Sequence, residues 1–160
     1  MEKKIFSLII ALMTMLLALP TMAQSTSQTP AERLFARYYD HHSPSVRVIN
    51  LNKEGIKKLF SGTTEEAKYK IIINHTTSAT ILFFSSPGTE LVSKIQQDIS
   101  GLKNAGYTKD PTEEASYYLV KNDRVVEQIG MEQENGNVMI LITKCDIQKN
   151  EFEAINNVAE

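Results

Sequence analysis

Residues 116–147 read SYYLVKNDRVVEQIGMEQENGNVMILITKCDI, and this stretch decides the fold. We predict three consecutive β-strands in it, over 116–121, 124–133 and 137–146, joined by turns at Asn122-Asp123 and Asn135-Gly136. Asn-Gly between apolar runs is a strong hairpin signal, because both central turn residues need a positive φ that asparagine and glycine tolerate. The last strand is apolar at consecutive positions from Val138 to Ile142, which predicts a central strand covered on both faces.

Two amphipathic helices are predicted before this meander. Thr29 is expected to cap the first helix, with Pro30 at its first position and Glu32 completing a capping box. The second helix spans Leu91–Leu102, where leucine and isoleucine recur at helical spacing, and Gly106 is expected to end it in a left-handed conformation. The apolar stripe of this second helix is predicted to lie on the sheet.

The remaining segments complete an α+β pattern. Residues 45–51 are predicted as a strand and residues 53–60 as a short helix. The runs 70–73 and 79–84 have strand length: either they form a hairpin, or the first of them ends a strand–helix–strand unit that begins at Val46. We therefore predict an α+β fold: a mostly antiparallel sheet with a C-terminal three-stranded meander and helices packed mainly on one face.

The first 23 residues are typical of a secretory signal peptide. Lys3 and Lys4 precede the apolar run Ile5–Leu19, and small residues flank Met22 before Gln24. The prediction is a signal peptide at 1–23, a disordered lead-in at 24–29, and a single domain at 30–160. The mature protein is expected to be exported, either periplasmic or extracellular, without a transmembrane span.

Composition excludes several classes of function. The chain has 17 basic and 19 acidic residues, and its basic residues form no stripe interleaved with aromatic ones, so we do not expect nucleic-acid binding. Its one cysteine, Cys145, cannot form an internal disulfide, and we interpret it as a small buried hydrophobe. No glycine-rich phosphate loop is present and no cofactor is predicted. The pairs Glu65-Glu66 and Glu113-Glu114 are interpreted as solvated loop charges.

The sequence offers few candidates for catalysis, and we assign no catalytic residue. Asp40, His41 and His42 are weak candidates for metal ligands, since imidazole binds zinc, copper or nickel. Neighbouring side chains on a helix diverge by about 100°, however, so one metal rarely uses both histidines. Cys145 and His75 would make a thiol nucleophile only if the fold brought them into contact with a third orienting group.

A ligand pocket is a further possibility. Between the 91–102 helix and the sheet, four aromatic residues are predicted to line a pocket for a small apolar ligand: Phe83, Phe84, Tyr117 and Tyr118.

Several segments resemble small exported proteins of Bacteroidota that are assigned to domains of unknown function. They are the Lys-Lys signal peptide, AERLFARY at 31–38, LKNAGY at 102–107 and VMILITKCDI at 138–147. The resemblance implies a Gram-negative envelope setting. Related proteins often carry a lipidated cysteine near the cleavage site, which this chain lacks, and the resemblance supplies no catalytic residues.

The hypothesis that follows is a non-enzymatic envelope or secreted protein that acts as a protein-binding or interaction module. Its partner would be another envelope protein or a second copy, bound through a sheet edge or a partly apolar face. The alternatives are a small apolar-ligand-binding protein and a thiol or metal-dependent enzyme.

Overall fold

The computed structural model describes residues 28–39, 46–61, 70, 73–111 and 113–157. The predicted signal peptide at 1–23 lies outside the described residues, as do His41 and His42. Within the described part of the chain, no helix is both long enough and apolar enough to cross a bilayer.

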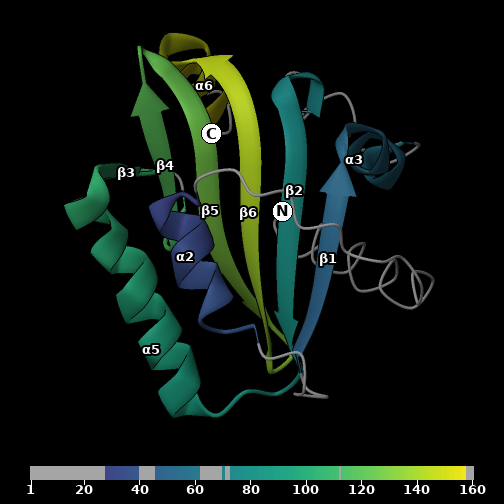
Figure 1. Cartoon of the computed structure of the whole chain (residues 1–160), viewed down its shortest axis with the longest axis vertical. Helices are drawn as coiled ribbons and strands as arrows, with labels where there is room; N and C mark the ends of the chain where they lie inside the picture. Colours follow the sequence, from purple (N-terminus) through teal and green to yellow (C-terminus); the bar gives the residue numbers. More distant parts are fainter. Residues whose placement is uncertain (1–27, 40–45, 62–69, 71–72, 112, 158–160) are drawn as a thin grey trace.

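A six-stranded antiparallel sheet forms the centre of the molecule, with strand order β1-β2-β6-β5-β4-β3 (Figure 1). The strands are β1 (Val46–Asn52), β2 (Thr76–Phe84), β3 (Tyr107–Lys109), β4 (Ser116–Lys121), β5 (Arg124–Glu134) and β6 (Asn137–Gln148). The helices are α2 (Pro30–Ala36), α3 (Lys53–Phe60), α5 (Thr89–Ser100), the short 3-10 helix η1 (Gly101–Ala105) and α6 (Lys149–Asn157). The α+β class and the C-terminal meander are confirmed, and the predicted central strand is β6, between β2 and β5.

The two meander turns have the backbone geometry that their residues predict. Asn122 and Asp123 have φ values of 50° and 62°, and Asn135 and Gly136 have values of 51° and 77°. All four residues have a left-handed backbone conformation, which a two-residue hairpin turn requires. Only two residues therefore join each pair of strands, and the turn sets the register of the pair. Glu134 therefore pairs directly with Asn137.

Helices α2 and α5 both cover the same face of the sheet (Figure 1). The N-cap of α2 is Thr29, whose hydroxyl accepts from the Glu32 backbone N–H while the Glu32 carboxylate accepts from the Thr29 N–H, so the capping box is confirmed. Helix α5 continues into η1, and Gly106 with a φ of 89° ends it as expected.

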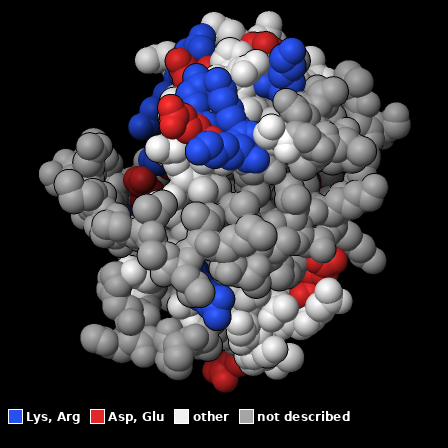
Figure 2. Space-filling model, turned by 90° about the vertical axis from the view of Figure 1, so that its right-hand side faces the viewer, with Lys and Arg blue, Asp and Glu red and all other residues white. Residues whose placement is uncertain are grey.

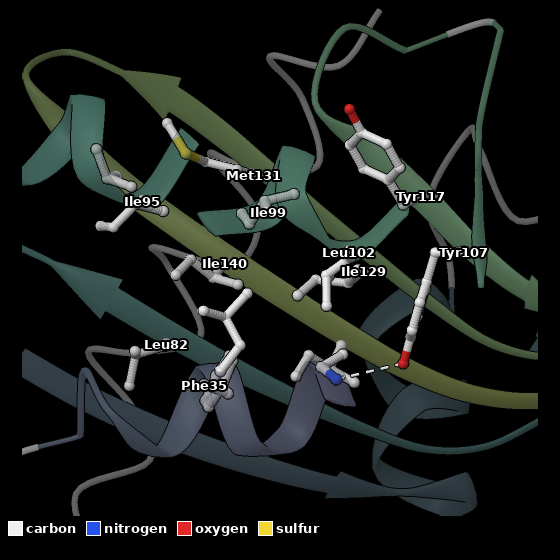
Figure 3. Close-up of a cluster of buried hydrophobic side chains, with 14 of the residues drawn as sticks. Phe35, Leu82, Ile95, Ile99, Leu102, Tyr107, Tyr117, Ile129, Met131 and Ile140 are labelled. Atoms are coloured by element: carbon white, nitrogen blue, oxygen red, sulfur yellow. Dashed lines mark hydrogen bonds between the residues drawn. The ribbon is translucent and has the colours of Figure 1, made fainter. Parts of the chain in front are cut away.

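The main hydrophobic core lies between these two helices and the sheet (Figure 3). Ile95, Ile99 and Leu102 form the stripe of α5 and η1 that the sequence predicts, and they meet side chains of β2, β5 and β6. A smaller cluster on the opposite face packs α6 through Phe152 against Tyr118, Val125 and Ile147. Burying these two faces is the main source of the fold's stability.

The strand predicted over residues 70–73 is wrong at its described positions. Lys70 and residues 73–75 are helical, and β2 begins directly after them at Thr76. Ile73 is buried in this helical conformation. Tertiary burial therefore overrides the preference of β-branched isoleucine for strands.

Helix α3 follows β1 without a loop, because Asn52 caps it by accepting from the Gly55 N–H at 2.9 Å. Its Lys53, Lys57 and Lys58 are exposed. Figure 2 shows the side of the molecule that lies to the right in Figure 1. Lysine and arginine side chains gather in the upper part of this side, with acidic side chains among them. The positive charge here is thus mixed with negative charge.

A test of the core compares two residues of α5. Replacing Ile99, which is 1% exposed, by alanine is expected to lower the free energy of unfolding by about 2–4 kcal/mol through lost burial and a cavity. The exposed Gln97, changed to alanine, serves as control and should shift stability by less than about 0.5 kcal/mol. Urea denaturation measures both; equal effects would contradict the placement of this stripe.

Candidate functional site

A charged cluster at the start of α2 centres on Glu127 of β5, whose residue exposure is 0%, while its charged neighbours Lys144 and Glu32 are about a third exposed. The Thr29 hydroxyl donates to its carboxylate, with distances of 2.8 and 3.0 Å to the two oxygens, and the Tyr107 hydroxyl donates to Oε1. The Lys144 ammonium lies 2.7 Å from Oε2 and 3.1 Å from the Glu32 carboxylate. Together these contacts join α2, β3, β5 and β6.

The protonation states in this cluster follow from its contacts. Burial and the neighbouring Glu127 carboxylate raise the pKa of Tyr107, which keeps its proton as a donor. Burial alone would lower the pKa of Lys144, but the hydrogen bonds and charges of Glu127 and Glu32 outweigh it and raise that pKa. For Glu32, burial works in the raising direction, while bonds from the Thr29 backbone and Lys144 give a net lowered pKa. The cluster therefore contains ion pairs.

We interpret this cluster as structural. Glu127 is fully buried and contacts Thr29, Tyr107 and Lys144, and the Tyr107 hydroxyl also accepts from the Ala31 N–H at 3.3 Å, a bond drawn in Figure 3. A substrate cannot reach a carboxylate that is fully buried and already paired with these side chains. The hydrogen bonds of this cluster hold the start of α2 against the sheet.

Sequence analysis missed Glu127, although a signal was present. Glu127 alternates with Ile129 and Met131 along β5, so a strand places all three on the core face. A register irregularity between Val125 and Glu127 directs Val125 to the opposite, α6-facing cluster. A glutamate on the apolar side of a strand predicts a buried carboxylate with a cationic partner.

An open cleft of about 650 Å³ lies between α5 and the end of β5. Its walls are a polar stripe of α5, the loop before β4 and the end of β5; its lining residues are Ser93, Gln96, Gln97, Ile99, Ser100, Glu113, Glu114, Ala115, Tyr117, Met131, Glu132, Gln133 and Glu134. Buried Ile99, Tyr117 and Met131 contribute its apolar surface, and polar side chains surround them.

The cleft carries negative charge. Four of its lining residues are glutamates and none is lysine or arginine. Glu114 and Glu134 have no ion pair with any other described residue. The nearby Lys109 ammonium is bonded to the backbone carbonyl oxygens of Asp110 and Glu113, at 3.5 and 3.1 Å. Glu113 and Glu114, interpreted from the sequence as solvated charges only, thus stand at this cleft.

Of the four aromatic residues predicted to line a pocket under this helix, only Tyr117 lines the cleft. Phe84 is buried in the main core. Tyr118 follows Tyr117 on the strand and so points to the opposite face, where it meets Phe152 of α6 with ring centroids 5.1 Å apart. Phe83 is also buried, beside Phe84 on β2 and directed to the other face. Adjacent strand residues could not share one pocket, which the prediction overlooked.

Cys145 and His75 are directed to different partners. The Cys145 thiol bonds the Val125 carbonyl oxygen at 3.5 Å, and burial together with the charges of Glu127 and Asp146 raises its pKa to about 12. The His75 ring meets the Asp146 carbonyl oxygen at 2.9 Å and lies 3.9 Å from Glu151. This environment opposes formation of a thiolate.

The metal-site candidates His41 and His42 lie outside the described residues. Within the part of the chain that the structure describes, no group of three or more histidine, cysteine, aspartate or glutamate side chains could hold a metal ion.

Comparisons with known proteins gave no match to a family model, a curated protein or a solved structure. The resemblance to exported Bacteroidota proteins stays a prediction.

The buried cluster can be tested through Lys144. Lys144→Met leaves the Glu127 carboxylate buried without its cation, and we expect a loss of about 3 kcal/mol in the free energy of unfolding. Adding Glu127→Gln should restore at least about 1 kcal/mol, because the uncompensated charge is gone and the amide oxygen still accepts. Urea denaturation of both variants measures the difference.

Lys94→Met is the matched control, because Lys94 also forms a 3.0 Å ion pair, with Asp98, but its side chain is 60% exposed. A change below about 1 kcal/mol is expected there. A Lys144→Met loss no larger than that of the control would contradict the role of the buried cluster.

A second test concerns the Cys145 thiol. At pH 8 its raised pKa leaves far less thiolate than in the unfolded chain, so alkylation by iodoacetamide should be at least about a hundredfold slower in native protein than in denaturant. Mass spectrometry over time measures both rates. Comparable rates would show a reactive thiol and would reopen the thiol-enzyme hypothesis.

Proposed function

We propose that this protein is an exported, non-enzymatic binding module that receives a polypeptide segment of a partner protein in the cleft between α5 and the end of β5. The observation that carries the proposal is the cleft itself: open, about 650 Å³, with buried Ile99, Tyr117 and Met131 surrounded by polar side chains. Export is supported by the signal-peptide pattern of residues 1–23.

The composition of the cleft favours a polypeptide over a small apolar ligand. Pockets for small ligands are mostly apolar, with few polar groups. Here nine of the thirteen lining residues are serine, glutamine or glutamate. An open channel of this kind offers hydrogen-bond partners to a peptide backbone and apolar contact to a few of its side chains.

The placement of the reactive side chains supports a role without catalysis. The Cys145 thiol is half-buried and bonded to a backbone oxygen, and the fully buried Glu127 carboxylate is paired with Thr29, Tyr107 and Lys144. Neither Glu127 nor Cys145 lines the cleft.

The proposal is tested by filling the cleft. A random-peptide display library is selected against the wild-type protein, and the enriched peptides are measured on Gln97→Trp, whose indole would occupy the cleft from α5. The affinity of the peptides for Gln97→Trp should be at least about tenfold lower than for the wild type, because a tenfold change requires a loss of only about 1.4 kcal/mol in binding free energy.

Thr89→Trp is the matched control: it is an exposed, uncharged residue of the same helix and does not line the cleft. Peptides should bind this variant as they bind the wild type. If no peptide is enriched, or if the enriched peptides bind Gln97→Trp equally well, the proposed function is wrong.

A further inference from the structure

The cleft opens on an edge of β5 that β4 leaves uncovered. β4 pairs with β5 only as far as Ser116, opposite Gly130, and one further bond joins the Met131 N–H to the Ala115 carbonyl oxygen at 3.1 Å. β5 continues for three more residues, Glu132–Glu134, which pair with β6 on their other side. Among the described residues, no strand pairs with these three residues on the β4 side.

The direction of the backbone groups follows from the pairing. In an antiparallel sheet, alternate residues direct both N–H and C=O to the same neighbouring strand. The Met131 N–H donates to Ala115, on the β4 side. Glu134 pairs with Asn137 across the two-residue turn, so its backbone groups point to β6. Gln133 therefore directs its N–H and C=O to the β4 side, where no backbone hydrogen bond joins it to another described residue.

The lining of the cleft shows that the edge itself is accessible. Met131, Glu132, Gln133 and Glu134 all line it, although side chains of consecutive strand residues point to opposite faces. A cleft on one face of the sheet takes its side-chain lining from alternate residues. Its contact with four consecutive residues therefore includes the β5 backbone beside the uncovered edge, with α5 as the opposite wall.

Charge and register then define the segment that would fit. Residues directly opposite each other on neighbouring strands share a face. A segment residue opposite Gln133 would lie on the α5 face, next to buried Met131 and Ile99. Its two neighbours would lie opposite Glu132 and Glu134, where positive side chains complement the glutamates.

We propose that the partner segment binds as a short added strand that continues the line of β4 along β5, and that it carries a basic–apolar–basic triplet. The apolar residue pairs with Gln133 and the two lysine or arginine residues pair with Glu132 and Glu134. This inference rests on the proposed function, and it adds the chemistry and the backbone geometry of the partner.

The test uses fluorescein-labelled heptapeptides in which four Ser/Thr residues precede a C-terminal Lys-Val-Lys amide, because Ala115 and β4 already occupy the positions along β5 that follow the triplet. Binding is measured by fluorescence anisotropy against the wild-type protein. A Glu-Val-Glu version should bind at least about tenfold more weakly, because like charges then face each other. N-methylation of the valine nitrogen should also cost at least about tenfold, since it removes the N–H that bonds the Gln133 carbonyl.

N-methylation of the first lysine is the matched control, because its N–H points away from β5 and the change should cost less than about threefold. On the protein, the Glu132→Gln/Glu134→Gln double variant should weaken binding of Lys-Val-Lys by about fivefold or more, while Glu90→Gln, on α5 outside the cleft, should leave it unchanged. Affinity should also fall as salt increases from 50 to 300 mM.

Two outcomes separate this inference from the proposed function. If display peptides depend on the cleft but Glu-Val-Glu binds as well as Lys-Val-Lys, or both N-methylated peptides bind alike, the added-strand inference is overturned and the proposed function stands. If no peptide depends on the cleft, both fall.

Discussion

The buried carboxylate of Glu127 is the constraint on which the arrangement of this fold depends. An unpaired carboxylate in such a place would be expensive, so its partners must all be present at once. They come from the N-cap of α2, from the edge strand β3 and from the central strand β6: Thr29, Tyr107 and Lys144. Because all three partners contact Glu127 at once, this one side chain fixes the positions of α2, the edge strand β3 and the central strand β6 relative to one another.

The same cluster explains why α2 and α5 share one face. Thr29 and Tyr107 hold the beginning of α2 above β5, and Ala31 donates to the Tyr107 hydroxyl. Helix α5 then covers the remaining part of this face through Ile95 and Ile99. Its neighbouring polar stripe of serine and glutamine stays uncovered, because β4 starts at Ser116 while β5 runs on to Glu134. The cleft is the space left by that difference in strand length.

The sequence analysis succeeded where a signal is local. Asn135-Gly136 specifies a hairpin through its own φ preferences, and Thr29-Pro30 with Glu32 specifies a helix start through hydrogen bonds within four residues. It failed for the strand predicted over residues 70–73, where Lys70 and Ile73 are helical, since burial of Ile73 against the rest of the fold outweighs a weak local preference. Of the four aromatic residues predicted to line one pocket, Tyr117 lines the candidate cleft, whereas the alternation of strand side chains and the core place Tyr118, Phe83 and Phe84 elsewhere.

Local chemistry was thus enough to predict the meander, the two-residue turns, the capped α2 and the amphipathic α5, because each depends on residues close together in the chain. The cleft required the tertiary structure. Its walls come from residues 93–100, 113–117 and 131–134, and no pattern within any one of them shows that the others lie beside it. Only the tertiary structure likewise places Glu113 and Glu114, predicted as loop charges, at the cleft, because the sheet order brings β5 beside the loop that precedes β4.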